Sequence, residues 1–333
     1  MADVYRANRA KMSDSQGMIA TMQLDEEQRD RAVGALLGSA VGDAVGAGYE
    51  FSHPAQDVVV DMIGGGPFDW APGQWTDDTS MATGVAAGLS PGAVDLDAIA
   101  AAFIAWYDTH PADIGTQTRS VLTHRDTTAA SMTARGSSLS GRTGGNGSLM
   151  RTGPVGVAFV RSDDAACAQA AGDISDLTHS DPQARQACEL WSVAIARGIR
   201  SGDRSGLRQY LSERDADVRS FWEPLLDEAE SGAPSDFSNN GWVVHALQTA
   251  WWAICTADGD VVETIGNCVR AGGDTDTTAA IAGALAGACA GTSGIPSRWT
   301  DMLHGYPGWT ATDLRATALR ILGEDPVNTL GHS

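Results

Sequence analysis

Two short segments each place paired carboxylates and hydroxyls directly before a predicted helix. They are WTDDT at residues 75–79 and GGDTDT at residues 272–277. Asp and Thr are preferred N-cap residues, so capping alone could explain either segment. One cap needs only one acceptor, however, and adjacent acids repel one another unless a cation lies between them. Oxygen ligands without a nearby His or Cys suit a hard divalent cation, so the two segments together predict a binuclear Mg²⁺ or Mn²⁺ site.

Two further segments carry groups that could contact a substrate. Residues 143–151 (TGGNGSLMR) form a Gly-rich loop whose backbone N–H groups could meet phosphate oxygens, although an ordinary flexible turn has the same composition. Residues 42–51 (GDAVGAGYEF) place Glu50 in an apolar, glycine-rich setting. Glu50 is therefore either a solvated surface group or a carboxylate of the site, and we favour the second.

Helices must position these segments, because apolar residues recur at helical spacing along most of the chain. One helix is predicted to start at Asp25, with Gln28 as its capping-box partner. Ala-rich runs predict others at 79–89, 96–107, 164–172, 183–199, 241–256, 261–270, 277–290 and 312–322. Strand signals are confined to 58–60 and 155–160, and the alternation of strands and helices typical of a doubly wound fold is missing. The sequence predicts a compact, all-α fold.

Glycines recur every four residues in two of the predicted helices. One series includes Gly34, Gly38 and Gly42, and the other is Gly283, Gly287 and Gly291. This spacing puts the glycines on one helix face, where another backbone can approach closely. Because an interior glycine costs about 0.5–1 kcal/mol relative to alanine, each series implies a packing or ligand reason.

Charge and composition exclude several classes of protein. The 333 residues include 22 basic and 42 acidic side chains, for a net charge of −20, and 43% of the residues are hydrophobic. The hydrophobic content is too high for a disordered chain. Duplex nucleic acid and anionic membranes both require a basic face, which this sequence does not offer. The acid excess favours a soluble protein and also supplies candidate metal ligands.

The cysteines and the ends of the chain bear on compartment and organisation. The five cysteines include no Cys-x-x-Cys pair, which argues against a disulfide framework or a thiolate zinc site and fits a reducing, cytoplasmic location. The polar first 24 residues do not resemble a signal peptide. Residues 277–297 carry no charge but are mostly Ala and Gly, which predicts a buried helix rather than a membrane span. We expect flexible tails at 1–24 and 326–333 around a single domain at 25–325, with a monomer favoured.

Taken in order, these segments resemble the ADP-ribosylglycohydrolase family, which includes the bacterial dinitrogenase-reductase-activating glycohydrolase. The resemblance extends from about Arg31 to about Gly291 and includes Thr178-His179, followed by Asp181-Pro182. It implies an all-α orthogonal helical bundle with two Mg²⁺ or Mn²⁺ ions in a central cleft. The metal ligands that it implies are Thr76, Asp77, Asp78, Asp274, Asp276 and Thr277.

The resemblance also implies substrate contacts. The pyrophosphate loop would comprise Gly144, Gly145, Asn146, Gly147 and Ser148, and the histidine beside the adenosine-side ribose would be His179. Glu50 matches a glutamate that in some relatives lies beside the metals on a movable segment. A carboxylate near the ions, namely Asp77, Asp274 or Glu50, would activate the attacking water or protonate the leaving group.

The implied activity is metal-dependent removal of ADP-ribose from a protein side chain, with arginine as the expected linkage. The partner would be an ADP-ribosylated protein or ADP-ribose. Linkage to serine, O-acetyl-ADP-ribose or a nucleic-acid base stays open as an alternative. So does a non-catalytic ADP-ribose-binding or crystallin-like protein, and a metal hydrolase of phosphate esters.

Overall fold

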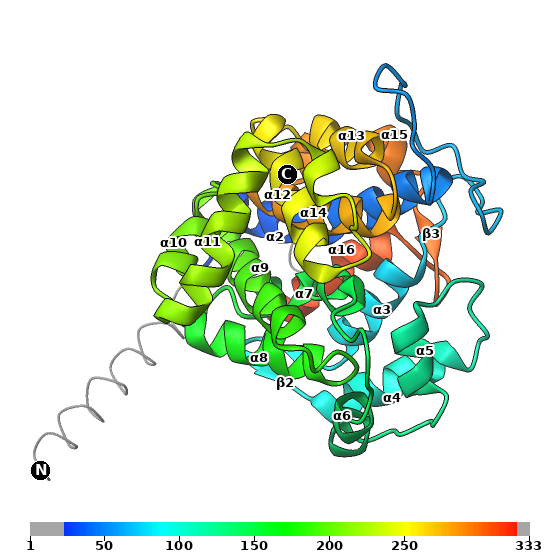
Figure 1. Ribbon diagram of the computed structural model, residues 1–333, viewed down its shortest axis with the longest axis vertical. Helices are drawn as coiled ribbons and strands as arrows, with labels where there is room; N and C mark the ends of the chain where they lie inside the picture. Colours follow the sequence, from blue (N-terminus) through cyan, green and yellow to red (C-terminus); the bar gives the residue numbers. More distant parts are fainter. Residues whose placement is uncertain (1–22, 325–333) are drawn as a thin grey trace, which may run out of the picture.

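The computed structural model describes residues 23–324, and its regular structure is almost entirely helical (Figure 1). The first half of the described chain contains α2 (Glu26–Gly46), η1 (Ala47–Tyr49), α3 (Asp77–Ala87), α4 (Leu96–Tyr107), α5 (Thr116–Leu122), α6 (Ala129–Ser137), η2 (Asn146–Arg151) and α7 (Gly153–Ala158). The second half contains α8 (Asp164–Asp176), α9 (Pro182–Ser201), α10 (Gly206–Ser212), α11 (Ala216–Ser231), η3 (Pro234–Phe237), α12 (Val243–Thr256), α13 (Val261–Ala271), α14 (Thr275–Ala290), η4 (Thr292–Gly294), α15 (Ser297–Thr300) and α16 (Ala311–Leu322). The predicted all-α fold is confirmed.

Strands make only a small contribution to the described structure. β1 (Leu89–Ser90) pairs antiparallel with β2 (Ala93–Val94), and β3 (His304–Gly305) pairs antiparallel with β4 (Trp309–Thr310). Each pair is a two-residue ladder beside a turn, so neither forms a layer of the fold. Of the tails expected at 1–24 and 326–333, residues 1–22 and 326–333 lie outside the described residues, whereas Leu24 is buried at 2% exposure.

The two glycine series pack directly against each other. Figure 1 shows α2 and α14 together in the middle of the molecule. A Cβ atom added to Gly38 would lie 2.2 Å from the carbonyl oxygen of Gly283, and one added to Gly283 would lie 2.2 Å from the carbonyl oxygen of Gly38. Only glycine permits this backbone-to-backbone approach, so the predicted close contact between helices is confirmed.

This seam between α2 and α14 sets the position of the acidic segments. At the end of α2, a Cβ atom on Gly46 would lie 2.4 Å from the Cα of Asp276, at the start of α14. The Thr275 hydroxyl donates to the Gly46 carbonyl at 2.9 Å, which ties the two helix ends together. The C-terminal end of α2 therefore lies against the N-terminal end of α14, where the GGDTDT segment stands.

The two predicted strands are wrong. Residues 155–160 fall largely in α7, which has Pro154 in its first turn, where proline is favoured, and whose residues are all buried. Burial on every side removes the alternation that distinguishes a strand, so the valines indicated the wrong element. Residues 58–60 form no strand, and Val59 is 87% exposed. The sequence also did not single out α5, α6, α10 and α11, whose apolar stripes are short or interrupted.

One contiguous hydrophobic core runs through the described chain, from Leu24 to Leu322. Among the described residues, only 26–49 form a helical segment long and apolar enough to cross a membrane. Within this segment, 94% of the apolar 18-residue stretch is buried inside the protein. It is the core helix α2 with η1. The expectation that the uncharged segment after Asp276 forms a buried helix is confirmed by α14.

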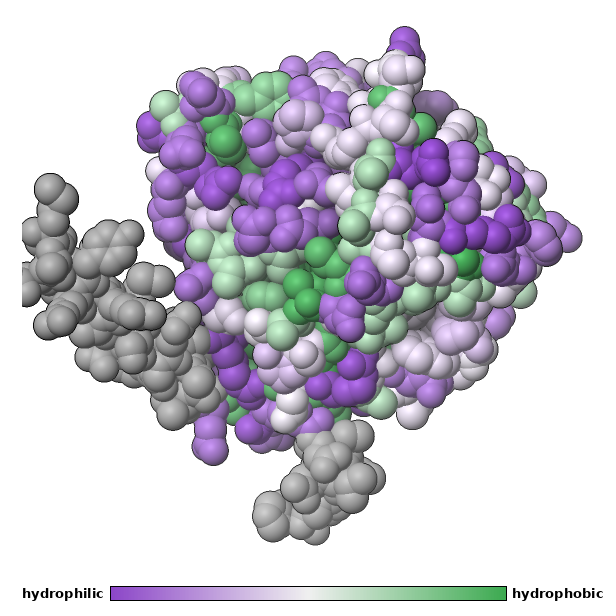
Figure 2. All heavy atoms as spheres, turned by 90° about the horizontal axis from the view of Figure 1, so that it is seen from below, coloured by the Kyte–Doolittle hydropathy of each residue, from purple (hydrophilic) through white to green (hydrophobic). Residues whose placement is uncertain are grey.

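Figure 2 shows a surface on which hydrophilic residues are spread widely, with smaller apolar areas between them.

Candidate active site

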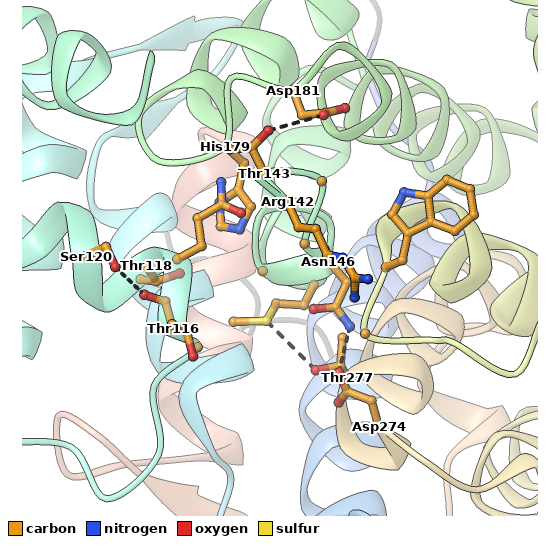
Figure 3. Close-up of a pocket in the computed structure, with 18 of the residues that line it drawn as sticks. Thr116, Thr118, Ser120, Arg142, Thr143, Asn146, His179, Asp181, Asp274 and Thr277 are labelled. Atoms are coloured by element: carbon orange, nitrogen blue, oxygen red, sulfur yellow. Dashed lines mark hydrogen bonds between the residues drawn. The ribbon is translucent and has the colours of Figure 1, made fainter. Parts of the chain in front are cut away.

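Seven parts of the chain meet around one cavity of about 820 Å³. They are the N-terminal ends of α3 and α14, the residues after η1, the residues before and within α5, the loop leading into η2, the connection between α8 and α9, and the residues before α12. Figure 3 shows Asn146, Asp274 and Thr277 close together, and the His179 side chain directed into the same space. Apart from Thr76, Asp78 and Ser148, every predicted site residue lines this cavity, namely Glu50, Asp77, Gly144, Gly145, Asn146, Gly147, His179, Asp274, Asp276 and Thr277.

The N-cap residues of α3 and α14 do not cap these helices in the ordinary way. Asp25, Asp95 and Asp260 each begin a helix elsewhere, and each side chain accepts a hydrogen bond from the first turn. Thr76 and Asp274 occupy the same N-cap position of α3 and α14, but neither side chain makes the capping hydrogen bond. Capping therefore does not explain the two segments, and their oxygens are directed elsewhere.

Instead, carboxylates gather at the base of the cavity. We refer to Asp43, Glu50, Asp77, Asp78, Asp274 and Asp276 as the acidic cluster. Oxygens of Asp43, Asp78 and Asp276 lie within 4.8 Å of one another, and so do oxygens of Glu50, Asp274 and Asp276. Asp276 belongs to both groups, so the geometry offers two neighbouring places where a cation could bind between carboxylates.

Two oxygens of this cluster are buried without a hydrogen-bond partner, Asp78 Oδ1 and Glu50 Oε2. Burial, together with the charge of Asp43, raises the pKa of Asp78 well above its usual range. Burial and the charges of Asp113 and Asp274 raise the pKa of Glu50 to about 8. Buried carboxylates at this density cannot all ionise unless positive charge is added, so the donor set fits a divalent cation bound by oxygen.

Asp43 also belongs to the acidic cluster. It lies in the segment 42–51, but we predicted no role for it from the sequence. Its Oδ1 accepts the Thr76 backbone N–H at 2.9 Å, and its Oδ2 accepts the Thr79 N–H at 2.9 Å and the Thr79 hydroxyl at 2.6 Å. Asp43 thus fixes the first turn of α3 from the end of α2. Burial raises its pKa to about 6. An acid among the glycine and apolar residues near the end of α2 was the signal that could have identified it.

Asp113, in the loop before α5, was not predicted at all. It lines the cavity, and its carboxyl lies within hydrogen-bond distance of that of Asp77. Burial and the neighbouring acids raise the pKa of both residues. Asp113 stands alone in a short loop without a motif, so nothing in the sequence distinguishes it from a solvated aspartate.

The loop before η2 supports Asp274 and lines the cavity with glycine backbone. Asn146 Nδ2 donates to Asp274 Oδ2 at 2.7 Å and to the Asn240 carbonyl at 2.9 Å. Asn240 in turn accepts the Asp274 backbone N–H at 3.1 Å. Asn146 thus orients the carboxylate of Asp274, and Asn240 holds its backbone N–H.

Ser148 and one loop amide differ from the expected pyrophosphate contacts. The Ser148 side chain is buried, accepts a hydrogen bond from Ser175 at 2.9 Å and does not line the cavity. The backbone N–H of Asn146 donates to the Gly241 carbonyl at 3.2 Å, so it is not free for a ligand. The local sequence could not show these two contacts, because Ser175 and Gly241 lie far along the chain from residues 146–148.

His179 lies on the opposite wall, between α8 and α9, and is 2% exposed. Its Nδ1 contacts the Thr178 hydroxyl at 2.7 Å. Burial and the positive charge of Arg151 hold the pKa of His179 well below its usual range, so the imidazole is neutral. Thr116, Gln117 and Trp242 complete much of the remaining wall.

Comparison with known proteins gives the class of this fold and site. Residues 24–330 match the ADP-ribosylglycohydrolase family. Over 293 residues the chain is 33% identical to the ADP-ribosylarginine hydrolase Tri1 of Pseudomonas putida (strain GB-1), covering 83% of this chain and 75% of that protein. It is 31% identical to the ADP-ribosyl-[dinitrogen reductase] glycohydrolase of Rhodospirillum rubrum, covering 82% of this chain and 90% of that protein.

The fold leads to the same class. A solved structure described as an ADP-ribosylglycohydrolase-related protein complex superposes with a TM-score of 0.72 at 29% identity, covering 90% of this chain and 99% of that one. The chain therefore belongs to the ADP-ribosylglycohydrolase family. It is an enzyme of that family, with the cavity described above as its candidate active site.

Proposed function

We propose that the enzyme hydrolyses the bond between ADP-ribose and a modified arginine side chain, with two divalent cations, Mg²⁺ or Mn²⁺, in the acidic cluster. The observation that carries the metal requirement is the pair of buried carboxylate oxygens without a partner, on Asp78 and Glu50. The two carboxylate groups that share Asp276 support two ions rather than one. Thr76, Asp77, Asp78, Asp274, Asp276 and Thr277 would hold them.

The arginine linkage is supported by two relatives. Besides the Pseudomonas protein, an ADP-ribosylarginine hydrolase Tri1 of Serratia proteamaculans (strain 568) is 30% identical over 288 residues, covering 84% of this chain. The partner is then a protein that carries ADP-ribose on an arginine. The five free cysteines support a cytoplasmic location, where thiols stay reduced.

The side chains around the acidic cluster supply positioning and proton transfer. When bound, the cations supply positive charge that orients the ribose hydroxyls and a water. The neighbouring carboxyls of Asp77 and Asp113 would share a proton beside the cavity, where it can pass to or from a reacting oxygen or nitrogen. Asn146 keeps the side chain of Asp274 in one orientation, and Glu50 lines the same cavity. Because carboxylates surround the reacting carbon, they stabilise positive charge as it develops there.

The test is release of ADP-ribose from defined peptides. Arginine-linked and serine-linked ADP-ribosyl peptides are incubated with the full chain in Mg²⁺, in Mn²⁺ and in excess EDTA. We expect release from the arginine-linked peptide, with a loss of activity in EDTA that either ion restores. Release that EDTA does not change would refute the metal requirement. Preference for the serine-linked peptide would refute the arginine linkage, and binding without release would indicate a non-catalytic module.

A further inference from the structure

Arg151 is fully buried, yet no carboxylate among the described residues forms an ion pair with it. Its guanidinium stacks over the Phe103 ring at 4.5 Å and its Nη1 lies 3.7 Å from Met81 Sδ. Its Nη2 donates to the Thr178 hydroxyl at 2.8 Å and to the Ile174 carbonyl at 3.4 Å. A buried arginine without an acid is costly, which indicates that its hydrogen bonds serve a purpose.

The contacts of Arg151 determine which way the next hydrogen bond runs. Guanidinium nitrogens only donate, so the Thr178 oxygen accepts from Arg151. The single hydroxyl hydrogen of Thr178 then needs an acceptor, because the side chain is buried at 0% exposure. Among the described residues, the remaining polar atom in reach is His179 Nδ1, at 2.7 Å. If Nδ1 carried the proton instead, the Thr178 hydrogen would be buried without a partner.

The far side of the ring therefore carries the proton. A neutral imidazole whose Nδ1 accepts must hold its hydrogen on Nε2. Nε2 lies against the glycine loop: a Cβ atom on Gly145 would be 3.4 Å from it, and one on Gly147 would be 3.2 Å from it. Within the described part of the chain Nε2 has no hydrogen-bond partner, and His179 lines the cavity (Figure 3).

We propose that Arg151 and Thr178 are positioning residues that fix His179 as the Nε2–H tautomer, so that it presents one hydrogen-bond donor to an acceptor oxygen of ADP-ribose. We call Arg151, Thr178 and His179 the histidine relay. The low pKa of His179 agrees with this assignment, because only the neutral ring has a tautomer to choose. The relay rests on the proposed function for the identity of its ligand, but the tautomer itself is a property of the free protein.

The tautomer is tested directly by imidazole ¹H–¹⁵N correlation spectra of the full chain labelled at histidine nitrogen, without ligand. The His179 signals are assigned by their loss in His179→Ala. We expect Nε2 protonated and Nδ1 unprotonated in the wild type and in Thr178→Ser, which keeps the hydroxyl. Thr178→Val removes the hydroxyl, so we expect the tautomers to mix. A proton on Nδ1 in the wild type would overturn the relay.

The functional consequence is tested by calorimetric titration with ADP-ribose. Thr178→Val should weaken binding about 3- to 10-fold, the effect of one misaligned hydrogen bond, while Thr178→Ser should bind like the wild type. In the His179→Ala background, Thr178→Val should have no further effect, because the two residues then act through the same atom. Equal weakening in both backgrounds would show that Thr178 acts through general packing and would overturn the relay.

A matched control separates the relay from the cost of losing a buried hydroxyl. Thr249 is 1% exposed and its hydroxyl donates to the His245 carbonyl within α12, away from the cavity lining. Thr249→Val should leave both the His179 spectrum and ADP-ribose affinity unchanged. If the wild type does not bind ADP-ribose at all, the proposed function fails, whereas the spectra still decide whether the relay exists.

Discussion

On the base of the cavity, carboxylate oxygens of Asp78 and Glu50 are buried without a partner, whereas on the wall Thr178 and the inner nitrogen of His179 are paired with each other. The acidic cluster is incomplete until positive charge is added to it. In the histidine relay, the contacts from Arg151 to Thr178 and from Thr178 to His179 are in place before any ligand binds, and one donor on His179 stays free; Arg151 Nε is buried without a partner. The first region should therefore respond strongly to cations and pH, and the second should respond to neither at neutral pH.

The largest expected effect comes from removing the carboxylate that both groups of the acidic cluster share. Asp276→Asn keeps the shape of the side chain but removes one negative charge and one ligand oxygen. We expect release of ADP-ribose to fall more than about 100-fold, beyond the usual cost of losing a group that only supports a ligand. The measurement is the peptide-release assay at saturating Mg²⁺ or Mn²⁺.

The same variant should be more stable than the wild type in EDTA, because it relieves repulsion among buried acids. The control is Asp301→Asn, an equal change of charge at an exposed position beyond α15, which should alter neither activity nor unfolding temperature. Near-normal activity of Asp276→Asn would show that the acidic cluster is not needed for catalysis.

The next effect concerns the orientation of Asp274. Asn146→Ala removes the amide that donates to Asp274 Oδ2 at 2.7 Å. We expect activity to fall about 10- to 100-fold, the range for losing a group that orients a metal ligand, together with a higher metal concentration for half-maximal rate. Asn267→Ala, at a buried asparagine of α13 outside the cavity, serves as the control and should keep full activity. A normal metal requirement in Asn146→Ala would contradict the role of Asn146 in supporting Asp274.

The seam between α2 and α14 should be sensitive to a single methyl group. Gly38→Ala forces Cβ to within 2.2 Å of the Gly283 carbonyl oxygen, so the helices must separate. We expect a loss of about 1–3 kcal/mol in the free energy of unfolding, the usual cost of overpacking. Chemical denaturation measures it. At Gly153 an added Cβ would meet Ala284 at 3.4 Å, an ordinary contact, so Gly153→Ala should change stability by less than about 0.5 kcal/mol.

A further expected effect is a pH dependence that distinguishes the two regions. In the absence of metal, Asp43 and Glu50 have folded-state pKa values raised to about 6 and about 8, above those of the unfolded chain. Such groups favour folding below their unfolded pKa values, and that contribution is lost as pH rises through the folded values. The unfolding temperature in EDTA should therefore fall as pH rises from about 5 to about 8.

Added Mg²⁺ or Mn²⁺ should flatten that slope, because the cation favours the ionised carboxylates. His179 acts in the opposite direction, since its lowered pKa reduces stability only as pH falls below the ordinary histidine range. An unfolding temperature that rises between about pH 5 and about pH 8 in EDTA would contradict the assignment of raised pKa values to the acidic cluster.

Periodicity and spacing alone determined much of the fold. The apolar pattern predicted most of the long helices, although not α11. The glycine spacing predicted a close contact between two backbones, which α2 and α14 make. These features are local or strictly periodic, so they can be recognised without knowing which element each helix packs against. The valines of 155–160 misled because burial on all sides of α7 left no period to distinguish a helix from a strand.

The candidate site divides in the same way. Thr76, Asp77, Asp78, Asp274, Asp276 and Thr277 stand in two dense motifs, so the sequence could mark them. Asp43 was not assigned a role within its segment and Asp113 carries no motif; they join the carboxylates around the cavity only because the end of α2 and the loop before α5 fold against α3.

Only the tertiary structure shows that capping does not explain the two segments, because the absence of a capping hydrogen bond at Thr76 and Asp274 is a matter of side-chain direction. It also decided that Ser148 turns into the core and that Arg151 reaches His179 through Thr178. Residue type and spacing fix which chemistry is available along the chain. The direction of each donor and acceptor depends on contacts between residues far apart in sequence, which are set when the helices pack.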